Sequence, residues 1–357
     1  MWLPHHKLLL QALRDPASLT DSAPAKWDLL LRLARRSQLL AHLAARMPRL
    51  AGIPEEAAIQ LRAAQIEAAE RRRMALWEIN RIERVLRGTG VPAILLKGAA
   101  YILAELPVAA GRLLSDVDIL VPEGNLNFIE DRFQQFGWES VKLDSYDQHY
   151  YRTWMHELPP LQYPGRVMQV DVHHAILPRT SRLHPDSRLL WQCARPLYGF
   201  YRLGDEDMVL HSATHLFYDS DFENRLRDLV DVDQLLRHFG ARPDFWTILL
   251  ERARQLDLQR PFFYALRFAQ RLLETPIPEE VQRCAREAAP NRSILLLMDR
   301  LVPIALMPPH PDASQFRYRA ACFPLYLRSH WLRMPPLLLT RHLLHKALLS
   351  QRETSTA

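Results

Sequence analysis

Cysteine and glycine are scarce in this sequence, which has three cysteines and 11 glycines in 357 residues. Three widely spaced cysteines, Cys193, Cys284 and Cys322, form neither a disulfide framework nor a zinc cluster. We therefore expect a protein of a reducing compartment, the cytoplasm.

Long apolar runs are also missing, since none approaches the roughly 20 residues that a membrane-spanning helix needs. The first 15 residues have a short apolar core and no small-residue cleavage site, so they do not predict a signal peptide. We expect a protein that is soluble or, at most, peripheral to a membrane.

Acidic residues are fewer than basic ones: 40 Asp and Glu against 46 Lys and Arg give a net charge of +6. The pI is about 9.3. Such a charge suits a polyanionic partner, whether nucleotide, nucleic acid or membrane surface, but we favour the simpler interpretation that it is the ordinary charge of an arginine-rich protein.

Helix-forming residues are abundant, and the length suggests more than one domain. Apolar residues recur at helical spacing before residue 88 and again after residue 204, with short strand-like segments between them. These patterns predict an α/β protein of the helix-rich α+β kind, with a small mixed β-sheet. We expect a helical region at 1–88, a core domain at 89–203 and a helical region at 204–357.

Two aspartates begin an apolar segment in the expected core domain. If Asp118-Ile-Leu-Val121 is a strand, Asp116 and Asp118 lie on one face, while Val117 and Ile119 lie on the other. Two adjacent carboxylates repel unless one is protonated or a cation lies between them. Oxygen ligands of this kind suit Mg²⁺.

A third aspartate lies in a later alternating segment, Arg166 to Ile176. There Val170 and Val172 point one way, while Asp171 and His173 point the other. Strands far apart in sequence can be neighbours in a sheet. Three strand-borne aspartates on one face would complete a two-metal site.

A strand, a turn and a helix start precede the aspartate pair. Val91 to Leu96 is the strand candidate, Lys97-Gly98 the turn, and a helix is expected from Ala99 to Leu106. Helix N-termini favour anions, so this arrangement suits a phosphate group. Lys-Gly is, however, also common in ordinary turns between strands and helices.

Two further features have alternative interpretations. His211 and His215 lie four residues apart on a predicted helix, and we favour buried, hydrogen-bonded histidines over metal ligands. The basic, apolar tail at 323–349 could bind a membrane interface, the domain itself or a partner protein, and packing on the domain or on a partner is favoured.

Together, Leu95-Leu-Lys-Gly-Ala99, Arg112 with Ser115 to Val121, and Val170-Asp-Val-His173 resemble the polymerase-β-like nucleotidyltransferase superfamily. The similarity is to its bacterial "nucleotidyltransferase family protein" branch and runs from about Val91 to Leu273. The resemblance implies that two Mg²⁺ ions, with Mn²⁺ as a substitute, bind a nucleoside triphosphate whose nucleoside monophosphate is transferred to an acceptor hydroxyl.

The resemblance also assigns roles to particular residues. Asp116, Asp118 and Asp171 would bind metal, and Asp171 would take the acceptor proton. Lys97 and Gly98 would meet the triphosphate, supported by Arg112 and Ser115. Arg112 could instead form a salt bridge with Asp116, and His173 could orient Asp171 or face the acceptor. Ala99 stands where superfamily members commonly have serine.

The resulting hypothesis is transfer of AMP from ATP to a hydroxyl of a small molecule or protein, with release of pyrophosphate. One alternative is a catalytically silent nucleotide-binding scaffold that recruits a membrane or protein partner through its tail. Another is nucleotide addition to RNA, which is less favoured because no recognised RNA-binding motif is present.

Overall fold

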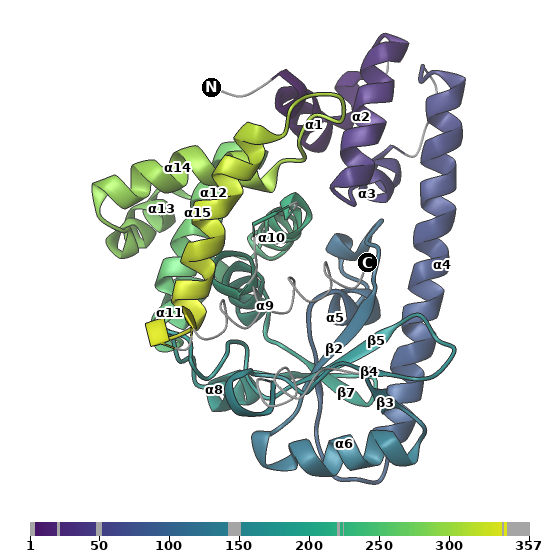
Figure 1. Cartoon of the computed structure of the whole chain (residues 1–357), viewed down its shortest axis with the longest axis vertical. Helices are drawn as coiled ribbons and strands as arrows, with labels where there is room; N and C mark the ends of the chain where they lie inside the picture. The colour runs from purple at the N-terminus through teal and green to yellow at the C-terminus, as the bar shows by residue number, and fades with distance from the viewer. Residues whose placement is uncertain are drawn as a thin grey trace, which may run out of the picture.

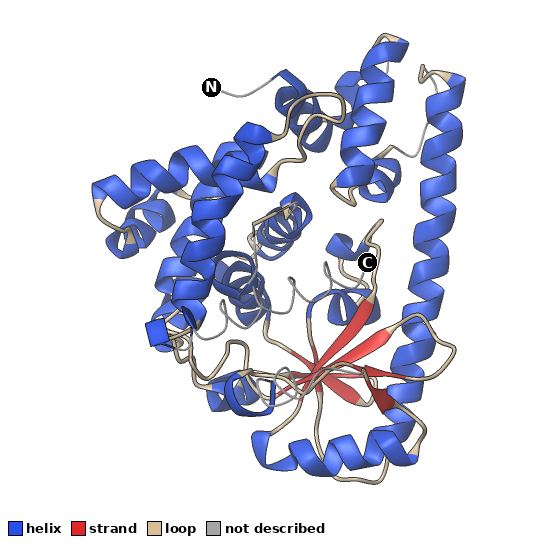
Figure 2. Ribbon diagram, viewed as in Figure 1, coloured by secondary structure: helices blue, strands red, loops and turns tan. Residues whose placement is uncertain are grey.

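A computed structural model describes residues 4–19, 22–47, 52–141, 151–219, 222–223, 225–337 and 339–340. The predicted fold class is confirmed: helices surround one mixed sheet of seven strands (Figure 2). The strands are short, and their bounds are β1 (Ile94–Leu95), β2 (Asp116–Leu120), β3 (Glu139–Ser140), β4 (Leu161–Gln162), β5 (Gln169–His173), β6 (Arg195–Leu197) and β7 (Phe200–Arg202).

The two longest strands lie side by side in the middle of the sheet. The strand order is β3-β4-β5-β2-β1-β7-β6. β2 pairs with β5 in parallel and with β1 in antiparallel orientation. Val117, Ile119, Val170 and Val172 are fully buried, as expected for the apolar face of alternating strands. The opposite face is therefore the one that carries the polar side chains.

Helices account for most of the remaining described chain. Those before the sheet are α1 (Pro4–Arg14), α2 (Pro24–Arg36), α3 (Leu40–Arg46) and α4 (Glu55–Leu86), and those between its strands are α5 (Lys97–Leu103), α6 (Leu126–Gln135) and α8 (Ser187–Gln192). Those after it are α9 (Asp205–Thr214), α10 (Leu226–Phe239), α11 (Phe245–Gln255), α12 (Gln259–Leu273), α13 (Glu279–Ala285), α14 (Arg292–Leu306) and α15 (Phe316–Arg333).

The long helix α4 connects the N-terminal helices to the sheet. Figure 1 shows it running along one side of the molecule, from α2 and α3 to the strands, with α6 beyond the sheet and the C-terminal helices on the other side. Glycine at position 111 permits a close approach here, since a Cβ on Gly111 would lie 2.3 Å from the carbonyl oxygen of Ala41. The N-terminal helices thus pack directly against the segment that leads into β2.

One hydrophobic core joins all three predicted regions. It runs from Leu9 in α1, through Ile119 in β2, to Leu325 in α15. The predicted domain boundaries at residues 88 and 203 therefore remain predictions.

Several expected elements differ in detail from the structure. The strand expected at Val91–Leu96 is reduced to the two residues of β1. The helix expected from Ala99 begins two residues earlier, at Lys97. In the helical region expected from residue 204, α10 begins at Leu226. A π-helical turn, η4 (His215–Asp219), continues α9. Such turns often occur at functional sites because they alter the helical register.

The polar aromatic segment at 141–162 has the composition of strands or of a substrate-facing loop. Residues 151–154 are helical and 161–162 form β4. The stretch 142–150 lies outside the described residues, so that part of the expectation stays a prediction.

The C-terminal helix α15 packs onto the rest of the chain. Arg328 donates to the carbonyl oxygen of Phe217 at 2.9 Å, and Thr180 donates to the carbonyl oxygen of Arg333 at 2.6 Å. Packing on the domain is thus observed for 323–333, while 341–349 lie outside the described residues. Phe323 remains 63% exposed, so α15 also presents apolar surface to solvent.

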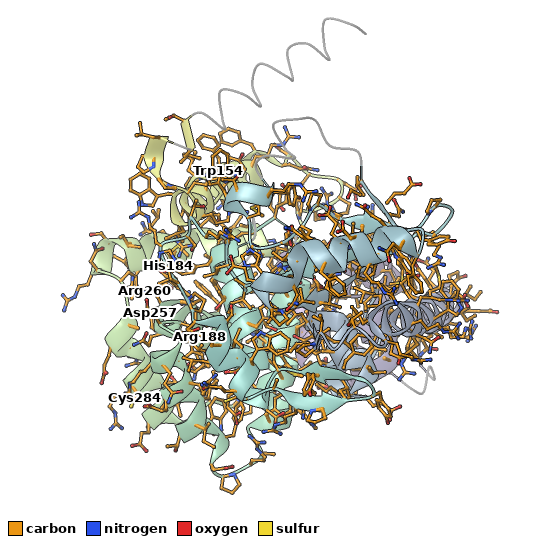
Figure 3. The ribbon with its side chains drawn as sticks, turned by 90° about the horizontal axis from the view of Figure 1, so that it is seen from below. Trp154, His184, Arg188, Asp257, Arg260 and Cys284 are labelled. Atoms are coloured by element: carbon orange, nitrogen blue, oxygen red, sulfur yellow. The ribbon has the colours of Figure 1, made fainter. Side chains whose placement is uncertain are left out.

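No disulfide joins the three cysteines, all of which lie in described segments. Cys284, labelled in Figure 3, is on α13, Cys193 directly follows α8, and Cys322 is on α15. Over the described ranges, no helix is both long and apolar enough to span a membrane.

Candidate active site

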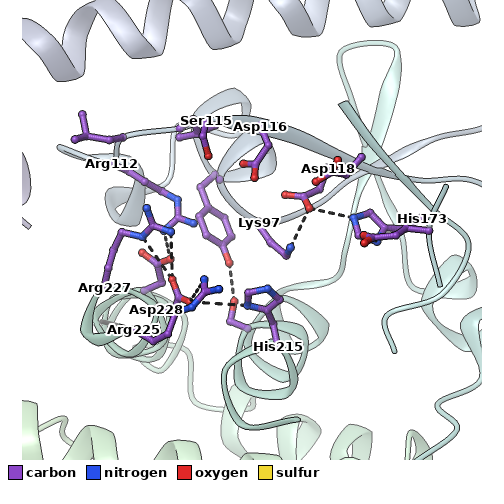
Figure 4. A pocket seen from close by; sticks show the side chains of 18 residues that line it. Lys97, Arg112, Ser115, Asp116, Asp118, His173, His215, Arg225, Arg227 and Asp228 are labelled. Carbon is purple, nitrogen blue, oxygen red and sulfur yellow. Dashed lines mark hydrogen bonds and ion pairs between the residues drawn. The ribbon is translucent and has the colours of Figure 1, made fainter. Parts of the chain in front are cut away.

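A pocket of about 250 Å³ lies between the polar ends of β2 and β5 and the helices α5 and α10. Its walls are crowded with charge (Figure 4). The basic residues lining it are Lys97, Arg112, Arg225 and Arg227, and the acidic ones are Asp116, Asp118, Glu157, Asp171, Asp228 and Asp231. Every predicted site residue lines this pocket, including Gly98, Ser115 and His173.

The three aspartates meet because of strand register. In the parallel pairing of β2 with β5, Asp118 lies opposite Asp171, and Asp116 lies opposite Gln169. Alternate residues of a strand share a face, so Asp116 lies on the same face as Asp118. The structure therefore brings together three carboxylates that are up to 55 positions apart in sequence.

Asp118 is buried and already has two partners. Its Oδ1 accepts from Lys97 Nζ at 2.9 Å and lies 3.0 Å from His173 Nε2. Burial alone would raise the pKa of Asp118, but the Lys97 ammonium and the His173 hydrogen bond hold that pKa well below its usual range. Asp118 is therefore a carboxylate at neutral pH.

Asp116 and Asp171 lack comparable partners among the described residues. Burial and the charge of Asp118 raise the pKa of Asp116, and the same two causes together with Glu157 raise the pKa of Asp171 to about 7. The Oδ1 atom of Asp171 is buried without a hydrogen bond. A buried acceptor with no donor is costly, and a cation at this position would satisfy it.

This donor set fits a hard divalent cation. Carboxylate oxygens are the ligands that Mg²⁺ prefers, and Asp116, Asp118 and Asp171 are the residues that would hold it. The unpartnered Oδ1 of Asp171 is the specific feature that a bound cation would explain.

Lys97 is held in an unusual backbone conformation. Its φ is +44°, in the left-handed region that a non-glycine residue rarely adopts, at the first residue of α5. Strained positions of this kind cluster at functional sites. From this position the Lys97 side chain reaches Asp118.

Gly98 has a packing role. A Cβ at this position would lie 2.7 Å from Arg112 Nε and 3.1 Å from the Leu114 side chain. Glycine therefore leaves room for the Arg112 guanidinium beside the helix start. Ala99, in contrast, is buried and is not among the described residues that line the pocket.

Arg112 forms an ion pair with Asp231 of α10, and not the salt bridge with Asp116 that was one of its two alternative roles. The guanidinium lies 5.7 Å from the centroid of the Tyr101 ring, whose hydroxyl is 2.7 Å from the Ser212 hydroxyl. Burial would lower the pKa of Arg112, but Asp231 outweighs it and raises that pKa. The buried pair fixes α10 against the segment before β2.

The start of α10 supplies residues that the sequence interpretation missed. Arg225 Nη1 lies 3.3 Å from Asp228 Oδ2, and Arg227 Nε lies 3.5 Å from Asp228 Oδ1. Arg227 also donates to the side chain of Gln38, in the turn between α2 and α3. The sequence signal was the spacing of Asp228 and Asp231, which places two acidic residues on one helix face.

Glu157 is a second omission, because it stands alone in an aromatic stretch. Its Oε2 lies 3.2 Å from His173 Nδ1. Burial would lower the pKa of His173, but Glu157 and Asp118 outweigh it and raise that pKa. His173 thus bridges Asp118 and Glu157, whereas the resemblance suggested that it orients Asp171 or faces the acceptor.

His211 and His215 lie at the back of the pocket wall. Burial, reinforced by Lys97, lowers the pKa of His211 to about 3 and that of His215 well below its usual value. Both are therefore neutral at pH 7. Neither belongs to a cluster with metal-ligand spacing among the residues that the structure describes.

Comparisons with known proteins identify the family of this chain. A family described as "Uncharacterised nucleotidyltransferase" matches residues 23–274. The chain belongs to this family. The match begins well before Val91, where the resemblance in the sequence motifs begins, and it includes α2 to α4. Membership implies a nucleotide substrate, and nucleotidyltransferases generally use divalent metals.

Other comparisons add little. No curated protein matches the sequence. Among solved structures, the chain is similar to the crystal structure of JHP933 from Helicobacter pylori, with 14% identity and a TM-score of 0.32. That alignment covers 74% of this chain and 96% of the other.

Proposed function

We propose that the protein transfers a nucleoside monophosphate, AMP from ATP, to a hydroxyl of a small molecule or protein. The acceptor oxygen forms a bond to the α-phosphorus, and the bond between that phosphorus and the oxygen of the β-phosphate breaks. Pyrophosphate leaves with the electron pair. The observation that carries this proposal is the register that places Asp118 opposite Asp171, with Asp116 on the same face.

Asp116, Asp118 and Asp171 would hold two Mg²⁺ ions, for which Mn²⁺ could substitute. When bound, these ions supply positive charge that neutralises the triphosphate and favours ionisation of the acceptor hydroxyl. The carboxylate geometry and the unpartnered Oδ1 of Asp171 support this assignment.

Asp171 is the residue that we assign to take the acceptor proton. It lies opposite Asp118 on the pocket face, and its Oδ1 has no hydrogen-bond partner among the described residues, so that oxygen is available to accept a proton. His173 has a different role: it keeps Asp118 oriented through the 3.0 Å contact.

The opposite wall suits the triphosphate. Arg225 and Arg227 both pair with Asp228, so two positive charges face one carboxylate. This wall therefore has one positive charge that its aspartate does not neutralise. Lys97 adds a further cation between the two walls. An anion that extends from the aspartates towards α10 would meet all three basic side chains, and the β- and γ-phosphates have that charge.

The pocket volume of about 250 Å³ is slightly below the range of roughly 300–1,000 Å³ that is typical of small-molecule sites. We therefore assign the pocket to the phosphates, with the ribose and base at its mouth. Ser115, which is exposed there, and Gly98 complete the proposed nucleotide-binding set.

Pyrophosphate release provides the first test. Purified protein with Mg²⁺, ATP and a lysate of its own source should release pyrophosphate, and Asp116→Asn and Asp171→Asn should each reduce the rate at least a hundredfold. Asp131→Asn, on the exposed surface of α6, is the matched control and should keep the wild-type rate. Equal rates in all four proteins would contradict the proposed metal and base residues.

A further inference from the structure

A second group of metal-ligand side chains lies beside the aspartates. Residues 156–158 run antiparallel to β5, with a bridge between Glu157 and His173. The backbone N–H of Leu158 donates to the carbonyl oxygen of Val172 at 2.9 Å. The backbone N–H of His174 donates to the carbonyl oxygen of His156 at 2.8 Å. These bonds hold His156 and Glu157 next to His173.

The side chains converge on one point. One ligand atom from each of His156, Glu157 and His173 lies within 4.8 Å of the other two, the only such group found among the described residues. His156 and His173 are buried, and Glu157 is partly exposed to the pocket. Ligands about 2.0–2.1 Å from a tetrahedral Zn²⁺ are about 3.3 Å apart. His173 Nδ1 and Glu157 Oε2 are 3.2 Å apart.

The second nitrogen of His173 strengthens this interpretation. A histidine that binds metal usually gives its other ring N–H to a carboxylate, which fixes the tautomer and the ring orientation. His173 Nε2 lies 3.0 Å from Asp118 Oδ1, so it can donate there while Nδ1 faces Glu157.

We propose that His156, Glu157 and His173 bind a borderline divalent cation of the Zn²⁺ class, at a site separate from the three aspartates. Two imidazoles and one carboxylate suit Zn²⁺ or Co²⁺, whereas Mg²⁺ prefers oxygen ligands alone.

The consequence is a link between this cation and the candidate active site. A bound cation would fasten residues 156–158 to β5 and hold the His173 ring in the orientation that contacts Asp118. The inference does not depend on the transfer reaction, since it concerns metal binding alone. Its failure and the failure of the proposed function are therefore distinguishable.

Metal binding to the full-length protein tests the site. Protein stripped with a chelator is titrated with Zn²⁺ by calorimetry, and with Co²⁺ by visible absorption, which reports a tetrahedral site with nitrogen ligands. We expect one Zn²⁺ per chain. Glu157→Gln, which preserves side-chain shape, and His156→Gln should each weaken binding at least tenfold.

Two controls separate this site from its neighbours. His174→Gln changes the next histidine along β5, which is outside the group, and should bind Zn²⁺ as the wild type does. The double variant Asp116→Asn/Asp171→Asn should also keep its zinc. The proposal is overturned if the wild type binds none, if Glu157→Gln and His156→Gln bind as tightly as the wild type, or if the aspartate variant loses the metal.

Discussion

The contact between Lys97 and Asp118 makes a specific prediction about stability. Lys97 Nζ lies 2.9 Å from Asp118 Oδ1, and the two side chains are 20% and 6% exposed. Removing one partner of a buried ion pair costs about 3–5 kcal/mol. Because His173 still contacts Asp118, we expect Lys97→Met to lower the free energy of unfolding by about 3 kcal/mol.

The loss of stability in Lys97→Met is measurable as a lower Tm, and bound Mg²⁺ should partly restore it. For a chain of this length, about 2 °C per kcal/mol gives a fall in Tm of roughly 6 °C without metal. Mg²⁺ should stabilise the variant more than the wild type, because in the wild type the Lys97 ammonium competes with the cation for Asp118. A cation at a hundred times its Kd returns about 2.7 kcal/mol.

Differential scanning calorimetry with and without Mg²⁺ measures both quantities. Lys26→Met, on the exposed face of α2, is the matched control, and its stability should stay within about 0.5 kcal/mol of the wild type. The reasoning is refuted if Lys97→Met melts with the wild type in the absence of metal, or if Mg²⁺ raises both Tm values equally.

Three further predictions concern packing, pH and nucleotide binding. Gly98→Ala should lower the free energy of unfolding in urea by about 1–3 kcal/mol, because its Cβ would be 2.7 Å from Arg112 Nε. Gly124→Ala, whose Cβ would have nothing within 4 Å, is the control and should cost less than about 1 kcal/mol. Equal losses in the two variants would contradict this reasoning. Burial lowers the pKa of His42 to about 4. The unfolded chain, in which this histidine has a pKa of about 6.5, takes up the proton first, so the contribution of His42 to stability falls by about 3 kcal/mol between pH 6.5 and 4. His42→Gln should flatten that fall relative to the wild type, and an unchanged pH profile would be inconsistent with it. Arg225→Gln and Arg227→Gln should each weaken ATP binding about tenfold while leaving AMP binding nearly unchanged. Arg237→Gln, elsewhere on α10, is the control and should bind both nucleotides as the wild type does. An equal loss of ATP and AMP binding would exclude the assignment of these arginines to the β- and γ-phosphates.

The strand-borne aspartates were predictable because a period of two is unambiguous. Val117 and Ile119 must enter the core, so Asp116 and Asp118 must face away from it. Only the register of β2 with β5 was missing, since pairing between distant strands depends on the whole sheet. The structure supplies it by placing Asp118 opposite Asp171.

The other wall of the pocket was harder to predict. Charges on an amphipathic helix usually face solvent, so Arg225, Arg227 and Asp228 resembled an ordinary polar face. Asp231 is buried only because Arg112 arrives from a distant segment to pair with it. A single sequence does not reveal that pairing, and the same holds for the contact between Glu157 and His173.

Turn details were wrong where tertiary contacts override local preference. Lys-Gly is common in turns between strands and helices, so the sequence suggested that the helix begins after Gly98. The Lys97 ion pair with Asp118 and the packing of Gly98 against Arg112 make the earlier start the stable one.

The position of the transferred phosphate tests the central claim most directly. Purified protein, Mg²⁺ and a lysate of its own source are incubated with ATP labelled at either the α- or the γ-phosphate, beside an Asp116→Asn/Asp118→Asn control. Nucleotidyl transfer predicts a labelled product only from the α position and none in the control. A product labelled from the γ position, or the same α-labelled product in the control, would contradict the account.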